Sequence, residues 1–181
     1  YSLHEFENSS FVVGLRLVNR RRSDAEFVVS CEWNFVVVGP PKGVEIRDLL
    51  ERPNVTRIGF VDPDRVPDVM NSLDVGLMPY KDIEYNESVF PLKFFEYLAC
   101  GLPVVGCGIP STAKYARRGI YHHTEADRDA FARGCAEALS WEDDAAERRA
   151  LAADASWSSK FDRLYDAVVS NVGTGDESDS L

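Results

Sequence analysis

The sequence predicts an α/β protein with a parallel sheet covered by helices on both faces. Short runs of apolar residues recur along the chain, turn residues follow them, and helical patterns separate them. The chain has 181 residues, 45% of them hydrophobic, which suffices for one domain with a sizeable core. The net charge of -10 disfavours binding to nucleic acid over most of the surface.

From residue 35 onward the expected elements alternate regularly. The expected strands are 35–38, 55–61, 75–79, 103–107 and, more weakly, 120–123. The expected helices are 44–51, 62–73, 91–100, 126–139 and a last one beginning near Trp157. Because ligands bind beyond the carboxyl ends of parallel strands, we expect the site near residues 39–41, 60–62, 79–81 and Gly106.

Both ends of the chain fall outside this regular order. Residues 1–34 form a poorly defined N-terminal segment, in which 11–18 could be a helix that ends in Arg20–Arg22. The basic run suits a helix C-terminus, and a phosphate site is the alternative. Residues 35–170 then form the main domain, and the acidic tail 171–181 is expected to be disordered.

Composition also suggests where the protein acts. The four cysteines show no C-x-x-C spacing, so we expect reduced, buried thiols in a cytoplasmic protein and no metal site. No apolar run approaches the length that spans a bilayer, and no secretory signal is visible. The chain starts at Tyr1 instead of Met, which suggests a segment of a longer protein.

The most informative stretch is an expected helix with a marked beginning and end. Pro91 suits the first helical position, where a missing N–H costs nothing. Gly101 suits the position after the last turn, and Pro103 prevents the helix from continuing. The helix is apolar almost all round, which predicts that it is buried. Its only charges are Lys93 and Glu96.

Lys93 and Glu96 stand three residues apart and share one face of this helix. One interpretation is a structural ion pair, although isolated helices prefer the reverse order of the two charges. The other is an anion site, where a diphosphate would meet the free N–H groups of the first turn, near Pro91 and Leu92, together with the Lys93 ammonium. Glu96 would then accept hydrogen bonds from sugar hydroxyls.

Residues 91–105 read P-x-K-x-x-E-Y-L-A-x-G-x-P-V-V. This run resembles the nucleotide-binding signature of retaining glycosyltransferases of the group 1 (family 4) type. The stretches 54–61 and 73–79 and the late Ser156-Trp157 resemble that family in order and spacing. The resemblance covers about residues 34–170.

The resemblance implies one half of a GT-B fold, namely the Rossmann-like domain that binds the donor nucleotide. Lys93 would neutralise the donor diphosphate, Glu96 would bind the ribose, and backbone groups near Phe60 and Val61 would meet the base. The donor would be a UDP- or GDP-linked sugar. No cofactor and no metal is implied, and peripheral membrane association is possible through the acceptor.

The chain departs from the family pattern in three ways. Many members carry a second glutamate eight positions before the one matched by Glu96, and Ser88 occupies that position here, with Glu87 one residue off. The family's glycine-bearing phosphate loop is not recognisable in residues 1–35. The acceptor-binding domain, which would be the partner of this chain, is absent from the sequence. We therefore name no catalytic residue.

Three functions stay open on the sequence alone. The first is the donor-binding half of a retaining glycosyltransferase, and the second is a truncated or non-catalytic module that binds nucleotide sugars. The third is a flavodoxin-like interaction domain, which the signature disfavours. If an N-terminal acceptor domain normally packs on the last helix, that helix should expose apolar residues.

Other residues have ordinary structural interpretations. His122 and His123 are expected as a surface pair on an edge strand. Thr124 and Ser156 are expected to cap the two helices that follow them. The tryptophans are expected to be packing residues, with platforms for sugar rings as the alternative; they are Trp33, Trp141 and Trp157.

Overall fold

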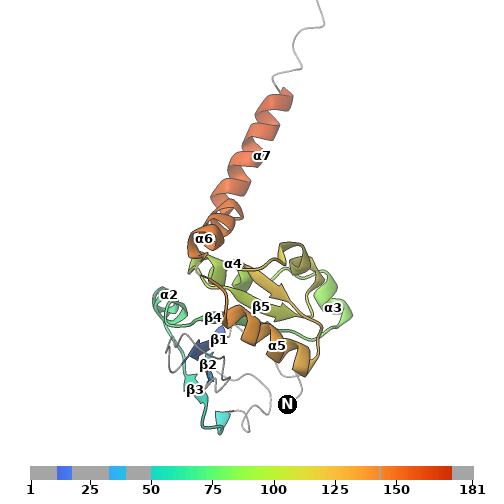
Figure 1. Cartoon of the computed structure of the whole chain (residues 1–181). Coiled ribbons are helices and arrows are strands. Elements are labelled where there is room, and N and C mark those ends of the chain that lie inside the picture. Colours follow the sequence, from blue (N-terminus) through green and yellow to red (C-terminus); the bar gives the residue numbers. More distant parts are fainter. Residues whose placement is uncertain (1–11, 18–32, 40–49, 143, 173–181) are drawn as a thin grey trace, which may run out of the picture.

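The computed structural model describes residues 12–17, 33–39, 50–142 and 144–172. It contains a six-stranded sheet with helices on both faces, so the predicted Rossmann-like α/β class is confirmed (Figure 1). The expected basic run at Arg20–Arg22, most of the helix 44–51, Cys31 and the tail from residue 173 lie outside the described residues.

The sheet has the strand order β3-β2-β1-β4-β5-β6. The strands are β1 (Val12–Leu17), β2 (Trp33–Val38), β3 (Val55–Ile58), β4 (Val75–Pro79), β5 (Val104–Cys107) and β6 (Tyr121–His123). Strands β2 and β3 pair in parallel, as do β4 with β5 and β5 with β6. The carboxyl ends of β4, β5 and β6 therefore lie at one edge of the sheet.

Strand β1 departs from the expected parallel pattern because it pairs antiparallel with both β2 and β4. The interpretation of residues 11–18 as a helix is wrong. The segment alternates as a strand does: Leu15 is buried on one face, and Gly14 approaches Leu73 so closely on the other that a Cβ would overlap that side chain. The sheet thus takes strands from both sides of the expected boundary at residue 34.

Short helices connect the strands, and α5, α6 and α7 follow the last strand, β6. They are η2 (Pro63–Arg65), α2 (Val66–Met70), α3 (Glu84–Glu87), α4 (Leu92–Ala99), η3 (Pro110–Tyr115), α5 (Arg128–Leu139), α6 (Ala145–Asp154) and α7 (Trp157–Val172), where η denotes a 3-10 helix. The helices that the sequence predicted around 62–73, 91–100, 126–139 and from Trp157 are confirmed.

Two apolar cores lie on opposite faces of the sheet. The α4-side core includes Val36, Val38, Met70, Met78, Phe94, Tyr97, Leu98, Val104 and Tyr121. The α5-side core includes Leu15, Val75, Leu77, Val105, Cys107, Phe131, Cys135 and Ala138. Successive residues of one strand, such as Val104 and Val105, enter different cores, as the two-residue period of a strand requires. Burial on both faces explains why these strands are continuously apolar.

Helix α4 lies against the sheet because Gly76 has no side chain. A Cβ on Gly76 would come within 2.5 Å of the Tyr97 ring. The ring is fully buried and rests directly on the backbone of β4. The missing methyl group therefore sets how closely α4 approaches the sheet.

The C-terminal end of α4 is fixed by two sets of hydrogen bonds. Gly101 has a φ of 80°, and the N–H groups of Gly101 and Leu102 donate to the carbonyls of Leu98 and Tyr97. This is a Schellman arrangement, and it confirms the helix end that the sequence predicted at Gly101. The buried Arg148 of α6 also donates to the Gly101 carbonyl, at 2.6 Å, and thereby ties α6 to this helix end.

Helix α5 begins later than expected and has a different cap. The Asp127 carboxylate accepts hydrogen bonds from the N–H groups of Ala130 and Asp129, at 2.9 and 3.0 Å. These bonds, that of Ala130 foremost, lower the pKa of Asp127. Thr124 donates instead to the carbonyl of Glu125, so the prediction that Thr124 caps this helix is wrong. Both side chains can cap, and the turn after β6 places only Asp127 at the helix start.

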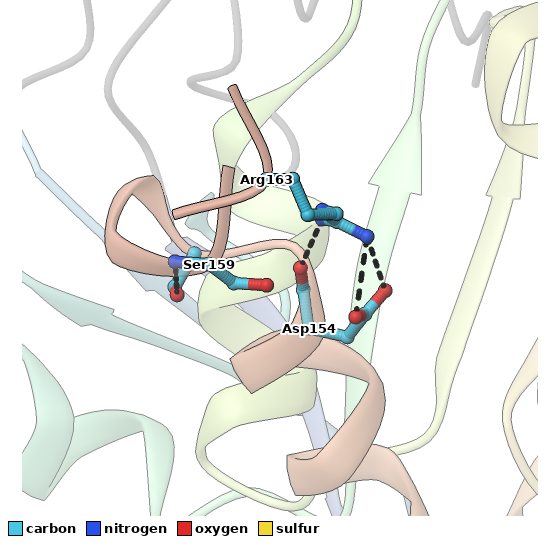
Figure 2. Close-up of polar contacts among 4 residues, drawn as sticks. Asp154, Ser159 and Arg163 are labelled. Atoms are coloured by element: carbon cyan, nitrogen blue, oxygen red, sulfur yellow. Dashed lines mark hydrogen bonds and ion pairs between the residues drawn. The ribbon is translucent and has the colours of Figure 1, made fainter. Parts of the chain in front are cut away.

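Hydrogen bonds between polar groups fix the connection between α6 and α7 (Figure 2). Ser156 accepts a hydrogen bond from the Ser159 N–H at 3.2 Å, which confirms it as the cap of α7. Arg163 of α7 donates to the backbone carbonyl of Asp154 at 2.7 Å and to its carboxylate at 3.3 Å. These contacts hold α7 in a direction that leads away from the sheet (Figure 1).

The apolar face of α7 is exposed, as the sequence predicted for the last helix. Trp157 is 79% exposed, so the expectation that it is a packing residue is wrong, whereas Trp33 and Trp141 do pack against the α5-side core. The exposed apolar side chains of α7 are Trp157, Phe161, Leu164, Tyr165, Val168 and Val169. They follow helical spacing and form one continuous stripe, which we call the α7 stripe.

Substituting Gly76 tests the contact between α4 and the sheet. We expect Gly76→Ala to lower the free energy of unfolding by about 1–3 kcal/mol, because the methyl group must displace the Tyr97 ring. Gly59→Ala is the matched control, since a Cβ there meets no atom within 4 Å. Urea unfolding measures both, and equal effects of the two substitutions would contradict the account.

The buried thiols give a second test. Burial raises the pKa of Cys107 to about 11 and that of Cys135 to about 12, so both are protonated at pH 8. Because only the thiolate reacts, alkylation mapped by mass spectrometry should modify Cys107 and Cys135 in the unfolded chain and spare them in the native one. Rapid labelling of either residue in the native protein would show that this core is open.

Candidate functional site

The first turn of α4 opens at the carboxyl edge of the sheet. Pro91 has extended backbone and lies just before the helix, which begins at Leu92, one residue later than the sequence predicted. The Pro91 carbonyl accepts a hydrogen bond from the Phe94 N–H at 3.1 Å. In the part of the chain that the structure describes, the N–H groups of Leu92 and Lys93 donate to no protein acceptor. The first turn also contains no acidic side chain, so its positive end is free to attract an anion.

Lys93 and Glu96 form an ion pair on this helix, between Nζ and Oε2. The Lys93 side chain is 22% exposed and that of Glu96 is 47% exposed, so the pair reaches solvent at the surface of α4. The expectation of a wholly buried helix is too strong, because Leu92 is also exposed while Phe94, Tyr97 and Leu98 are buried. The apolar sequence reflects packing on several sides of the helix. Its first turn, with the N–H groups of Leu92 and Lys93, stays open, and we call it the mouth of α4.

The surroundings of Glu96 connect the pair to the end of β4. Burial and then the Glu96 carboxylate raise the pKa of Tyr80, which follows β4 directly. Burial and Glu96, opposed by Arg149 and Lys93, also raise the pKa of Cys100. The negative charge of Glu96 therefore affects the ionisation of both Tyr80 and Cys100. Because Tyr80 lies at the carboxyl edge of the sheet, this charge acts there as well.

The other predicted site residues lie on two segments near this edge. Phe60 follows β3 and is 78% exposed, while Val61 packs partly against the α4-side core. Glu87 ends α3, and Ser88 follows it; both are exposed. Among the described residues, no hydrogen bond joins Glu87 or Ser88 to the pair on α4.

The structure adds a polar chain that the sequence did not predict. Thr112, Tyr121 and His123 are linked by hydrogen bonds of 2.8 and 3.0 Å at the carboxyl end of β6. Both histidines are half-buried, so the expected surface pair is only partly correct. His122 lies on the opposite face, where it stacks on Trp141 and pairs with Glu137 at 3.3 Å. Alternation along the strand was the signal that could have separated them.

The backbone after β5 is pressed against the end of β4. Gly108 has a φ of 71°, and a Cβ there would overlap the carbonyl oxygens of Tyr80 and Lys81. Only glycine suits both the conformation and the close approach. The loops that follow β4 and β5 are thereby held together, which fixes the shape of this edge.

This arrangement offers N–H donors, one ammonium group and one carboxylate within a single helical turn. The donors and the ammonium group suit an anion, and the carboxylate suits hydroxyl groups. Within the described ranges, no cluster of three or more His, Cys, Asp or Glu side chains could hold a metal ion. No helix in those ranges is long and apolar enough to cross a bilayer.

Comparisons with known proteins identify relatives of the chain. Residues 18–140 match the family model described as glycosyl transferases group 1. The chain is 39% identical over 140 residues to a Bacillus subtilis (strain 168) protein named "Putative teichuronic acid biosynthesis glycosyltransferase TuaH". The match covers 74% of this chain and 35% of that relative, so the chain spans about a third of its length. No solved structure matches significantly.

The matched region includes all of β2 to β6 and the helix that carries Lys93 and Glu96. Both the extent of the family match and the identity to the relative exceed what chance likeness of fold would give. The chain belongs to the glycosyl transferases group 1 family.

Proposed function

We propose that this chain is the donor-binding half of a retaining glycosyltransferase that transfers a sugar from a nucleotide-diphosphate sugar. The observation that carries the proposal is the open mouth of α4, with two free N–H groups and the Lys93 ammonium beside them. Membership of a glycosyltransferase family supports sugar transfer as the general activity.

The diphosphate would bind at the first turn of α4. Its oxygens would accept from the N–H groups of Leu92 and Lys93 and from the Lys93 ammonium, so that Lys93 would exchange its carboxylate partner for phosphate. Because the chain carries a net charge of -10, this positive end is needed to attract a diphosphate against the surrounding field. The same donors would stabilise the diphosphate as it leaves the sugar, without a metal ion.

The rest of the nucleotide would extend toward the end of β3. Glu96, once released from Lys93, would accept hydrogen bonds from the ribose hydroxyls. Backbone groups near Phe60 and Val61 would meet the base, and the exposed Phe60 ring adds apolar surface there. Pro91, Glu87 and Ser88 would border the bound donor, with Ser88 in the position where many relatives carry a glutamate. The donor would be a UDP- or GDP-linked sugar.

The acceptor and the catalytic groups would come from a second, N-terminal domain. Two observations support this: the chain spans 35% of its relative, and the α7 stripe is an apolar surface of the kind that a neighbouring domain covers. The whole enzyme would act in the cytoplasm and could meet a membrane-associated acceptor at the bilayer surface.

A nucleotide-sugar-binding module without turnover is the second candidate. The observation in its favour is that the described residues offer binding groups, while no nucleophile with an adjacent base is found among them. The two candidates share the donor site and differ only in whether a second domain completes it.

Isothermal titration calorimetry with UDP and GDP tests the donor site. We expect Lys93→Gln to weaken binding about tenfold to a hundredfold, because a charge-assisted hydrogen bond to phosphate is lost. Glu96→Gln should weaken binding less, since the amide oxygen still accepts from ribose. Lys160→Gln is the control, because Lys160 lies on α7 over the Trp157 ring. Absence of binding by the unsubstituted chain would favour a flavodoxin-like interaction domain instead.

Sedimentation velocity tests the role of the α7 stripe. The uncovered stripe should make the isolated chain self-associate at high concentration, and Phe161→Ser with Val168→Ser should restore the monomer. Asp166→Ser, on the polar side of the same helix, should leave the association unchanged. A monomeric unsubstituted chain at the highest concentration would contradict the proposed covering domain.

A further inference from the structure

The hydrogen bonds that end on His123 have a single consistent direction. The Ile109 carbonyl can only accept, so the Thr112 hydroxyl gives it its proton, at 2.8 Å. The Thr112 oxygen has no second proton and must accept from the Tyr121 hydroxyl, at 2.8 Å. The Tyr121 oxygen must then accept from His123, whose Nδ1 lies 3.0 Å away.

The reverse direction fails at the first link. If Tyr121 donated to His123, Thr112 would have to donate to Tyr121, and the lone pairs of Thr112 Oγ1 and the Ile109 carbonyl would face each other at 2.8 Å. Neutral His123 therefore carries its proton on Nδ1 and presents a lone pair on Nε2.

The series of hydrogen-bonded side chains that fixes this tautomer is buried and held in place. Thr112 and Tyr121 are almost wholly buried, and Gly106 makes room for the Tyr121 hydroxyl, which a Cβ would approach within 2.7 Å. Burial and the neighbouring His122 lower the pKa of His123, which favours its neutral form near pH 7. Nε2 has no protein partner in the described residues and is not among their buried, unpaired polar atoms, so it reaches solvent.

His123 lies at the same edge of the sheet as the mouth of α4. It pairs with Gly106 at the carboxyl end of β5, beside β4. The Phe94 ring of α4 lies 5.1 Å from that of Tyr121. Next to Thr112, Ser111 of η3 donates to the carbonyl of Val89, in the segment that leads into α4, at 2.7 Å. The lone pair of Nε2 is therefore presented from a rigid frame that includes the start of α4.

We propose that His123 is a specificity-determining residue that accepts a hydrogen bond from a hydroxyl group of the transferred sugar. This rests on the proposed donor site, which assigns the diphosphate to Lys93, the ribose to Glu96 and the base to backbone groups near Phe60 and Val61. A neutral imidazole nitrogen with a lone pair repels phosphate oxygens and attracts O–H groups. Of the parts of a nucleotide sugar, the sugar ring then remains as the one that suits His123.

Nitrogen-15 NMR of the histidine side chains in the free chain tests the tautomer directly. We expect Nδ1 of neutral His123 to be protonated and Nε2 to be bare, and we expect Tyr121→Phe to remove this preference. A neutral His123 protonated on Nε2 in the unsubstituted chain would overturn the inference. This measurement needs neither ligand nor turnover.

Calorimetry with UDP, GDP and their hexose-linked forms tests the contact with the sugar. His123→Asn keeps a polar group near the Nδ1 position and removes the acceptor, so it should weaken sugar-nucleotide binding about fivefold and leave diphosphate binding unchanged. His123→Gln, which places an oxygen near the Nε2 position, should recover part of that loss.

The outcomes separate this inference from the proposed function. If the unsubstituted chain binds neither UDP nor GDP, the donor site itself is wrong, and the sugar contact with it. If the nucleotides bind and His123→Asn weakens them and the sugar nucleotides equally, or changes neither, the donor site stands and the role of His123 is overturned.

Discussion

The structure depends on one contact, the Tyr97 ring of α4 lying on the bare backbone of Gly76 in β4. This contact sets the height of the helix over the sheet. The Schellman turn at Gly101 and the buried Arg148 then fix its C-terminal end. With one end held and one face buried, the free N–H groups at the other end keep a fixed position at the edge of the sheet. An anion site made of backbone donors needs this rigidity, because the donors have no side-chain freedom with which to adjust.

The polar groups at this edge fall into two kinds. Lys93 and Glu96 satisfy each other on the surface of α4 and can exchange partners when a ligand arrives. Thr112, Tyr121 and His123 form a buried chain that starts on a backbone carbonyl and cannot rearrange without losing a hydrogen bond. An exchangeable pair suits a charged group that must be captured and released, and a fixed acceptor suits the discrimination of hydroxyl positions. In the proposed site, the same helix face and its neighbouring strand would thus combine binding strength with selectivity.

Much of this could be predicted from the sequence where one local signal had one interpretation. Pro91 and Gly101, which mark the two ends of the helix, located α4 to within a residue. Continuous apolar runs located β2, β4 and β5. The direction of β1 could not be predicted, because the pattern of residues 11–18 suits a helix or a strand and only pairing with β2 and β4 decides. Thr124 and Asp127 are both good caps, and the path of the chain after β6 selects one. The role of His123 depends on the Tyr121 side chain two residues before it and on Thr112, eleven residues before it in a 3-10 helix, which no local pattern reveals.

The central claim is that a diphosphate binds at the mouth of α4. A crystal structure of the chain with UDP or GDP tests it most directly. The account predicts diphosphate oxygens within hydrogen-bond distance of the Leu92 and Lys93 N–H groups, with the Lys93 ammonium turned from Glu96 toward phosphate. A nucleotide bound elsewhere, or an ion pair between Lys93 and Glu96 that persists unchanged beside a bound nucleotide, would contradict it.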